Sequence, residues 1–96
     1  MENNVLQPYV VLGNNIIMWS GNHIGHHTKI GNNVFLSSHV VVSGRCEIDD
    51  NCWFGVNSSV RDGVKIGTNT YICMSSSVIQ NTTANSKYRG NPAKPV

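Results

Sequence analysis

Residues 24–42 read IGHHTKIGNNVFLSSHVVV, and an apolar residue returns at every sixth position of this stretch: Ile24, Ile30, Leu36 and Val42. The same column continues in both directions along the chain, through Leu6, Leu12, Met18, Ile48, Phe54, Val60, Ile66, Ile72 and Val78. In a chain that is 40% apolar, thirteen such positions in a row would arise by chance about once in 10⁵ trials. A six-residue period fits neither an α-helix nor the alternation of a single strand. It is typical of a hexapeptide β-helix.

A longer period of eighteen residues, which equals three hexads, overlies the short one. It relates the segments Leu12-Gly13-Asn14-Asn15, Ile30-Gly31-Asn32-Asn33, Ile48-Asp49-Asp50-Asn51 and Ile66-Gly67-Thr68-Asn69. Gly, Asn and Asp tolerate the left-handed backbone angles of a tight corner, so Asn15, Asn33, Asn51 and Asn69 should form a column at one corner. We therefore expect an all-β, three-sided parallel β-helix of about four coils over residues 1–80.

The second inward position of each hexad, two residues before the apolar one, is mostly small. Its occupants are Thr28, Val34, Val40, Cys46, Cys52, Ser58, Val64, Thr70 and Ser76. Small residues allow a narrow triangular core to close. The segment 81–96 leaves the six-residue register and is rich in Thr, Asn, Ser, Gly and Pro, so it is expected to be a C-terminal tail that packs on the last coil.

The hexads resemble the [LIV]-[GAED]-x-x-[STAV]-x pattern of left-handed β-helix acyltransferases over about residues 6–94. Within that superfamily, His26 with Gly44 one coil later, FGVNS at residues 54–58 and GNPAK at residues 90–94 resemble bacterial sugar O- and N-acyltransferases of the sialic acid and bacillosamine pathways. The left hand is implied by the resemblance, because the general preference for right-handed crossovers favours the other hand. The resemblance also implies acetyl-CoA as acyl donor, a sugar or nucleotide-sugar acceptor and a homotrimer, with no metal.

His26 lies two positions after inward Ile24 and points outward near the end of one side. In the resembling family this site holds the general base, and acyl transfer from a thioester to an amine or hydroxyl requires a proton acceptor with a pKa near 7. Gly44 lies one coil after His26, and its counterpart in the family donates a backbone N–H to the thioester carbonyl. The residue after the base is often acidic in the relatives. Here it is His27, which can orient His26 by hydrogen bonding but supplies no negative charge.

Four further residues are candidates for coenzyme binding. His39 and Asn57 belong to one corner column, where contact with the coenzyme or with a neighbouring subunit is expected. In the family the Gly-x-Pro-Ala-Lys segment runs near the nucleotide end of the coenzyme, which makes Arg89 and Lys94 candidates for phosphate contacts. For each of these residues the alternative is an ordinary surface role, as a hydrogen-bonded corner residue or a solvated cation.

Composition narrows the classes of partner. The net charge of +2 is too small to favour nucleic acid, and no basic cluster or aromatic stacking platform is present. No signal peptide or membrane-spanning run appears, so a cytoplasmic protein is expected. At 96 residues a single core is marginal, which favours oligomerisation. Cys46 and Cys52 occupy inward positions and should be buried thiols, while Cys73 follows inward Ile72 and should face outward.

Two other functions compete with an acyltransferase. A zinc hydratase of the γ-carbonic anhydrase type shares the fold, but its site needs a His five residues after the first ligand, and that position is Gly31 from His26. A non-catalytic trimeric scaffold or remnant is the second alternative.

Relatives of the sugar acyltransferase type carry an additional Rossmann-like domain that binds the acceptor. No β-α-β pattern or Gly-rich phosphate loop occurs here, so the resemblance covers the acyl-donor half.

Overall fold

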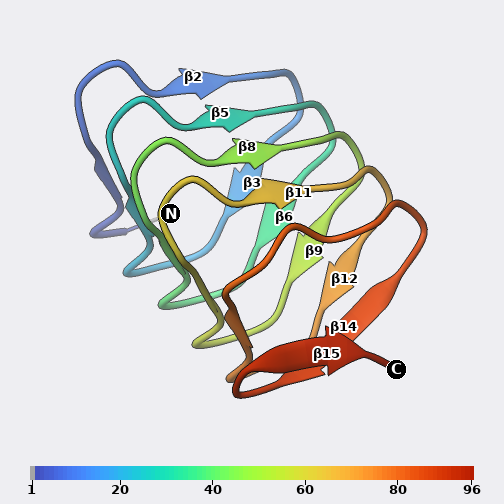
Figure 1. The fold of residues 1–96 in the computed structure, drawn as a ribbon. Coiled ribbons are helices and arrows are strands. Elements are labelled where there is room, and N and C mark those ends of the chain that lie inside the picture. The colour runs from blue at the N-terminus through green and yellow to red at the C-terminus, as the bar shows by residue number, and fades with distance from the viewer. Residues whose placement is uncertain (1) are drawn as a thin grey trace.

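The computed structural model describes residues 2–96, which form fifteen short strands in three sheets. Figure 1 shows the strands wound as successive coils of a three-sided prism, with one strand of each coil on each side. Sheet A contains β1 (Val5–Leu6), β4 (His23–Ile24), β7 (Val41–Val42), β10 (Ser59–Val60) and β13 (Ser77–Val78). Sheet B contains β2 (Val11–Leu12), β5 (Lys29–Ile30), β8 (Glu47–Ile48) and β11 (Lys65–Ile66). Sheet C contains β3 (Ile17–Met18), β6 (Phe35–Leu36), β9 (Trp53–Phe54), β12 (Tyr71–Ile72), β14 (Lys87–Gly90) and β15 (Ala93–Pro95).

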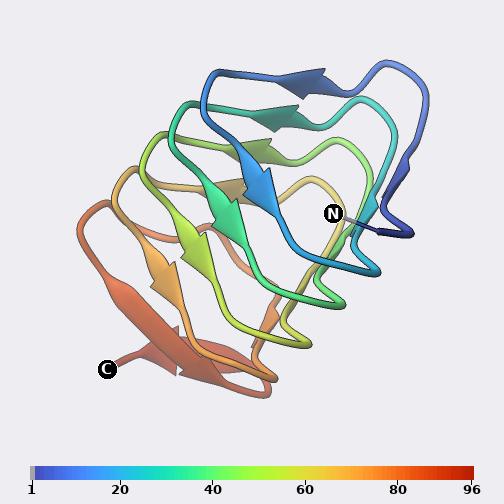
Figure 2. The same ribbon diagram turned by 180° about the vertical axis from the view of Figure 1, so that it is seen from behind.

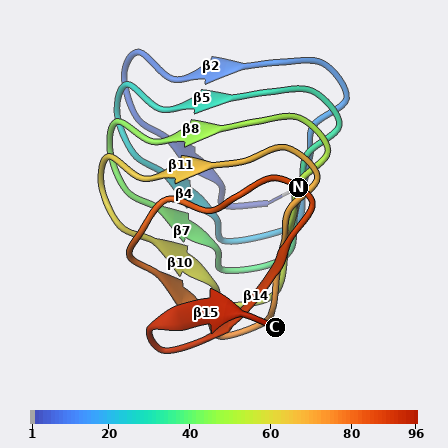
Figure 3. The same cartoon turned by 45° about the vertical axis from the view of Figure 1, so that its right-hand side comes forward.

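Pairing within the sheets follows the eighteen-residue period. His23 lies beside Val41 in parallel register, and Val41 beside Ser59. Because a parallel neighbour is reached only after a full coil, each coil contacts the coils directly before and after it. The view in Figure 3 shows this for sheets A and B, whose strands follow one another down two adjacent sides.

The corners use the left-handed backbone conformation that the sequence predicted. Asn15, Asn33, Asn51 and Asn69 have φ values of 60°, 59°, 61° and 56°. Their side chains also join neighbouring coils, since Asn15 Nδ2 donates to Asn33 Oδ1 at 2.8 Å. The predicted Asn column is confirmed.

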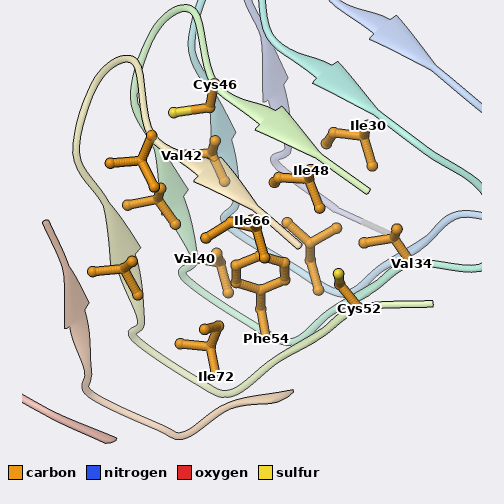
Figure 4. Packing of buried hydrophobic residues seen from close by; sticks show 14 of the residues in the cluster. Ile30, Val34, Val40, Val42, Cys46, Ile48, Cys52, Phe54, Ile66 and Ile72 are labelled. Carbon is orange, nitrogen blue, oxygen red and sulfur yellow. The ribbon is translucent and has the colours of Figure 1, made fainter. Parts of the chain in front are cut away.

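The interior is filled by the two inward columns. From Ile24 to Val78 the residues of the main column are 0–3% exposed, and the small residues of the second column, Cys46 and Cys52 included, are 0–4% exposed. Figure 4 shows the ring of Phe54 among the other buried side chains of this core. The sequence-based register is therefore confirmed for the body of the prism.

The outer surface of sheet C carries a column of rings. Trp53 stacks on Tyr71, with 4.5 Å between ring centroids and 7° between planes, and Phe35 stacks on the other face of Trp53 at 5.4 Å. The edge of Trp19 meets Phe35 at 5.5 Å, and Lys87 Nζ lies 5.4 Å from the Tyr71 centroid. Pairs of this kind across neighbouring strands stabilise a sheet by about 0.5–1.5 kcal/mol each.

The C-terminal segment continues the prism and then reverses. Lys87 pairs with Tyr71 in parallel, at an offset of sixteen residues rather than eighteen, and β15 then pairs antiparallel with β14. Figure 2 shows these strands closing one end of the molecule. No helix long and apolar enough to cross a membrane occurs in residues 2–96.

Candidate active site

The candidate catalytic residues lie at the corner between sheets A and B, which we call the A–B corner (residues 25–27, 43–45 and 61–63). After Ile24 the chain leaves β4, turns through His26 and His27, and enters β5 at Lys29. His27 has a φ of 58°, and His is one of the non-glycine residues that adopt this region more often than average. The turn at His27 leaves the side chain of His26 directed along the corner towards the next coil.

The two imidazoles contact each other directly. Nδ1 of His26 lies 3.0 Å from Nδ1 of His27, and the ring planes are perpendicular. One of the two nitrogens must carry the hydrogen and the other must accept it, so the contact couples the tautomers of the two rings. In this contact, a hydrogen bond from one ring to the other fixes how the His26 ring is turned.

The first coil supports this pair. The ring of Tyr9 stacks on His27 with 4.9 Å between centroids, and Gln7 Oε1 accepts the backbone N–H of His26 at 2.9 Å. Sequence reasoning missed both supports, and the only signal for them is the eighteen-residue spacing that puts Tyr9 one coil before His27. Side-chain rotamers decide both contacts.

Gly44 lies directly beneath the His26 ring. A Cβ placed on Gly44 would come within 2.8 Å of His26 Nε2 and 3.0 Å of its Cε1. Real Cβ atoms do not approach other atoms so closely. The structure gives a steric reason for a glycine here, because any side chain at position 44 would displace the His26 ring.

The backbone N–H of Gly44 is unpaired in the described chain. Its carbonyl accepts a hydrogen bond from Gly63 N at 3.0 Å, but no acceptor within residues 2–96 takes its N–H. An unpaired N–H beside an imidazole can stabilise negative charge on a bound oxygen.

A shallow hollow of about 140 Å³ opens at this corner, lined by His26, Gly44, Arg45, Asp62 and Gly63. Arg45 and Asp62 were not among the sequence candidates, although adding eighteen residues to His27 and Gly44 leads directly to them. The ion pair found within residues 2–96 joins Lys65 and Glu47 at 4.0 Å. Arg45 and Asp62 therefore line the hollow together without forming a salt bridge with each other.

His39 and Asn57 lie at a different corner, between sheets C and A, which we call the C–A corner (residues 19–21, 37–39, 55–57 and 73–75). Both have left-handed backbones, with φ values of 59° and 61°. A Cβ on Gly21 would come within 2.5 Å of His39 Nδ1, so the His39 ring lies over Gly21. Within one chain, the structure does not bring His39 or Asn57 to His26.

Arg89 and Lys94 face each other across the antiparallel pair β14 and β15. Lys94 lines a hollow of about 470 Å³ together with Gln80 and residues of the C-terminal turn. Gln80 is the next member of the column that contains His26, Gly44 and Asp62, so this hollow lies at the C-terminal end of the A–B corner. Lys94 is thus on the same edge of the prism as His26, several coils away.

The thiols Cys46 and Cys52 take no part in the site. Burial raises the pKa of both above the ordinary value of 9.0, and Cys46 Sγ donates to the carbonyl of Arg61 at 3.2 Å. Cys73 is only partly buried. Within residues 2–96 no three His, Cys, Asp or Glu side chains are grouped so that they could hold a metal ion.

Comparison with known proteins identifies structural neighbours for this arrangement. No protein-family model and no curated protein sequence matches the chain. Serine acetyltransferase from Neisseria gonorrhoeae matches with a TM-score of 0.87 and 27% identity over 91% of this chain and 37% of its own. The fold is a left-handed β-helix. Soybean serine acetyltransferase matches with a TM-score of 0.85 and 27% identity, over 91% of this chain and 40% of its own.

A third neighbour, UDP-N-acetylglucosamine acyltransferase from Campylobacter jejuni, has a TM-score of 0.83 and 22% identity, over 91% of this chain and 44% of its own. All three neighbours are acyltransferases built on the hexapeptide β-helix, and the expected fold class is confirmed. The chain spans 37–44% of the length of these neighbours.

Proposed function

We propose that this chain is the acyl-donor part of an acetyl-CoA-dependent acyltransferase that modifies an amino or hydroxyl group of a sugar or nucleotide-sugar acceptor in the cytoplasm. One observation carries the proposal: His26 and Gly44, whose N–H is unpaired within residues 2–96, line the same hollow, and His26 Nε2 lies against Gly44. Acyl transfer needs a proton acceptor beside the nucleophile and a donor where charge develops on the carbonyl oxygen. The acyltransferase activity of the structural neighbours supports the same reaction class.

His26 is the proposed general base. When its Nδ1 carries the hydrogen and donates it to His27, Nε2 presents a lone pair to the hollow. The acceptor's amine or hydroxyl then attacks the thioester carbonyl carbon while Nε2 takes the nucleophile's proton. When the C–S bond breaks, the departing thiolate receives that proton, and the imidazole returns to its starting form.

Gly44 is the proposed oxyanion donor. The attack converts the thioester carbonyl into an oxyanion, and a backbone N–H held in place by the coil stabilises it without reorganisation. In comparable sites, one such donor lowers the barrier by about 2.7–4 kcal/mol. His27 acts through His26, as a residue that fixes the tautomer and orientation of the base.

The A–B corner offers a path for the rest of the coenzyme. A Cβ on Gly63 would meet nothing within 4 Å, so the surface beyond Gly44 is open. Farther along the same edge lies the hollow at Gln80 and Lys94. We assign Lys94 and Arg89 to the phosphates of the coenzyme, because paired cations suit a multiply charged anion.

The proposed assembly is a homotrimer with sheet A towards the threefold axis. The outward column of sheet A, Val5, His23, Val41, Ser59 and Ser77, contains no Asp, Glu, Lys or Arg. On sheet B the corresponding column includes Lys29, Glu47 and Lys65. Interface centres are depleted in charge, which favours sheet A. In this arrangement the C–A corner of one copy, with His39 and Asn57, meets the A–B corner of the next and completes its coenzyme groove.

The proposal is tested by replacing the base. His26→Ala should lower kcat by about 10²–10⁴-fold while coenzyme affinity changes little, because the imidazole acts mainly in the transition state. Transfer from acetyl-CoA to a panel of amino sugars and nucleotide sugars gives kcat, and calorimetry gives the coenzyme affinity. Lys29→Ala, on exposed sheet B, is the control. Absence of coenzyme binding by the wild type would contradict the proposal and favour a non-catalytic scaffold.

A further inference from the structure

The three corners of the prism differ in the residues that adopt the left-handed backbone. At the corner between sheets B and C these residues are all asparagine: Asn15, Asn33, Asn51, Asn69 and Asn85. At the A–B corner the left-handed residues are Tyr9, His27, Arg45 and Gly63, with φ values of 65°, 58°, 56° and 74°. Asparagine and glycine adopt this conformation readily, whereas a bulky residue such as tyrosine rarely does. Tyr9 therefore departs furthest from the usual choice of corner residue.

The left-handed backbone directs the Tyr9 ring onto the candidate site. Side chains at such corner positions reach the same position of the next coil, as the hydrogen bond from Asn15 to Asn33 shows. The residue one coil after Tyr9 is His27, and the two rings are stacked with 4.9 Å between centroids and 23° between planes. Backbone outliers of this kind cost free energy and gather at functional sites.

The tautomer of the proposed base depends on how the His27 ring is turned. His26 presents a lone pair on Nε2 only when its hydrogen is on Nδ1, and Nδ1 of His27 is the acceptor that lies 3.0 Å away. Rotation of the His27 ring about its Cβ–Cγ bond would carry that acceptor away. His26 could then hold its hydrogen on Nε2, where it can take no proton from a nucleophile.

The first coil holds His27 at two points. Pro8 O accepts the backbone N–H of His27 at 3.2 Å, which fixes the main chain at the corner. The Tyr9 ring covers one face of the imidazole, so rotation of the imidazole would break the stack. The edge of the same imidazole meets His26, whose ring plane is perpendicular to it. A stacked pair favours one orientation of a ring by about two- to tenfold.

We propose that Tyr9 is a positioning residue of the acyl-transfer site. Tyr9 does not line the hollow at His26 and Gly44, and it acts through His27, whose orientation sets the tautomer of His26. The inference rests on the proposed function, because it assigns Tyr9 a role in preparing the general base. Its physical content, a tautomer that depends on a stacked ring, can be measured without any reaction.

Three variants separate the ring from other properties of the residue. Tyr9→Asn removes the ring and keeps a residue that suits the left-handed backbone. Tyr9→Phe keeps the ring and removes the hydroxyl. Tyr71→Asn is the matched control, because Tyr71 is also a surface tyrosine stacked on a neighbouring ring, that of Trp53, but lies on sheet C away from the site. Circular dichroism checks that each variant is folded at the assay temperature.

The kinetic test uses acetyl-CoA with the panel of amino sugars and nucleotide sugars. Tyr9→Asn should lower kcat by about three- to tenfold and leave KM and coenzyme affinity within about twofold of wild type, because the ring acts only on the base. Tyr9→Phe and Tyr71→Asn should keep the kcat of the wild type. In the His27→Asn background, Tyr9→Asn should change kcat by less than about twofold, because the ring through which Tyr9 acts is absent.

The tautomer of His26 is measured in the free protein by nitrogen NMR of the imidazole groups, at a pH at which the rings are neutral. His26→Ala identifies the signal. The hydrogen of His26 should be on Nδ1 in the wild type, in Tyr9→Phe and in Tyr71→Asn, and the form with hydrogen on Nε2 should increase in Tyr9→Asn.

The outcomes distinguish this inference from the proposed function. A wild-type tautomer in Tyr9→Asn, or equal losses of kcat with and without His27, overturns the role of Tyr9. In an active enzyme an unchanged kcat of Tyr9→Asn also overturns it, and the proposed acyl transfer then stands. If the wild type transfers no acyl group, the proposed function fails, and the tautomer in Tyr9→Asn alone decides whether Tyr9 positions the two histidines.

Discussion

Replacing Gly44 by alanine should reduce activity without reducing stability. The added Cβ would lie 2.8 Å from His26 Nε2, 3.0 Å from Cε1 and 3.2 Å from Cδ2. Carbon and nitrogen atoms in contact prefer separations of about 3.5 Å or more, so the ring must shift by roughly 0.5–1 Å. A misplacement of about 1 Å in a catalytic group can cost about 10²-fold in rate.

Stability should respond in the opposite direction. Gly44 does not have a positive φ, so alanine fits its backbone, and the loss of chain freedom in the unfolded state stabilises by about 0.4–1 kcal/mol. The Tm should therefore stay within a few degrees of wild type. Gly63→Ala provides the contrast in stability, because its φ of 74° makes a side chain there cost about 1–2 kcal/mol.

The assay is a double-mutant cycle in kcat. If the added methyl group acts by displacing the base, Gly44→Ala should lower kcat about 10²-fold in the wild type and much less in the His26→Ala background. Coenzyme affinity, measured by calorimetry, shows whether thioester access is also reduced. Equal losses in the two backgrounds would refute the displacement of His26 and point instead to a side chain that blocks the approach of the thioester to the Gly44 N–H, which alanine retains.

Phe54→Ala should lower the free energy of unfolding by about 3–5 kcal/mol through lost burial and a cavity. Trp53→Ala removes two exposed ring stacks and should lower it by about 1–3 kcal/mol. Thermal melts that show equal losses for the two variants would mean that Phe54 does not face inward. Burial raises the pKa of Cys46 and Cys52 above 9.0, so the folded state keeps these protons to a higher pH than the unfolded state does. The stabilisation from the neutral thiols is therefore complete below pH 9.0 and declines above it. When both cysteines are replaced by alanine, urea titrations should show a smaller fall in the free energy of unfolding as the pH rises above 9.0. Asparagine tolerates a positive φ, so His27→Asn should leave the Tm unchanged. It should lower kcat about tenfold and change the pH profile of kcat. An unaltered pH profile would exclude a role for His27 in setting the tautomer of the base.

Sequence predicted the body of the fold because its determinants are periodic. A β-helix repeats one backbone geometry, so the residues that face inward from Ile24 to Val78 could be read from spacing alone. Leu6 and Leu12 belong to the same pattern but are exposed. Burial in a stacked coil depends on having a neighbour on both sides, and a spacing rule contains no information about the ends.

Only those features of the site that depend on the eighteen-residue spacing could be predicted from the sequence. The pairing of His26 with Gly44 comes from the eighteen-residue step, and the same step could have added Asp62. The contact between the His26 and His27 rings depends on rotamers, and so does the stacking of Tyr9 on His27. Neither leaves a trace in the spacing.

The ring column on sheet C bears on how the molecule unfolds. In a solenoid each coil touches only its neighbours, so coils could melt one after another from an end. Trp19, Phe35, Trp53 and Tyr71 come from four successive coils, and each ring contacts the next. Each contact between neighbouring coils is thus strengthened by a ring pair, and this stabilisation is lost as soon as either coil unfolds. Strong coupling between nearest neighbours turns a sequential melt into a concerted one, and the chain should unfold in one transition with no stable partly wound intermediate.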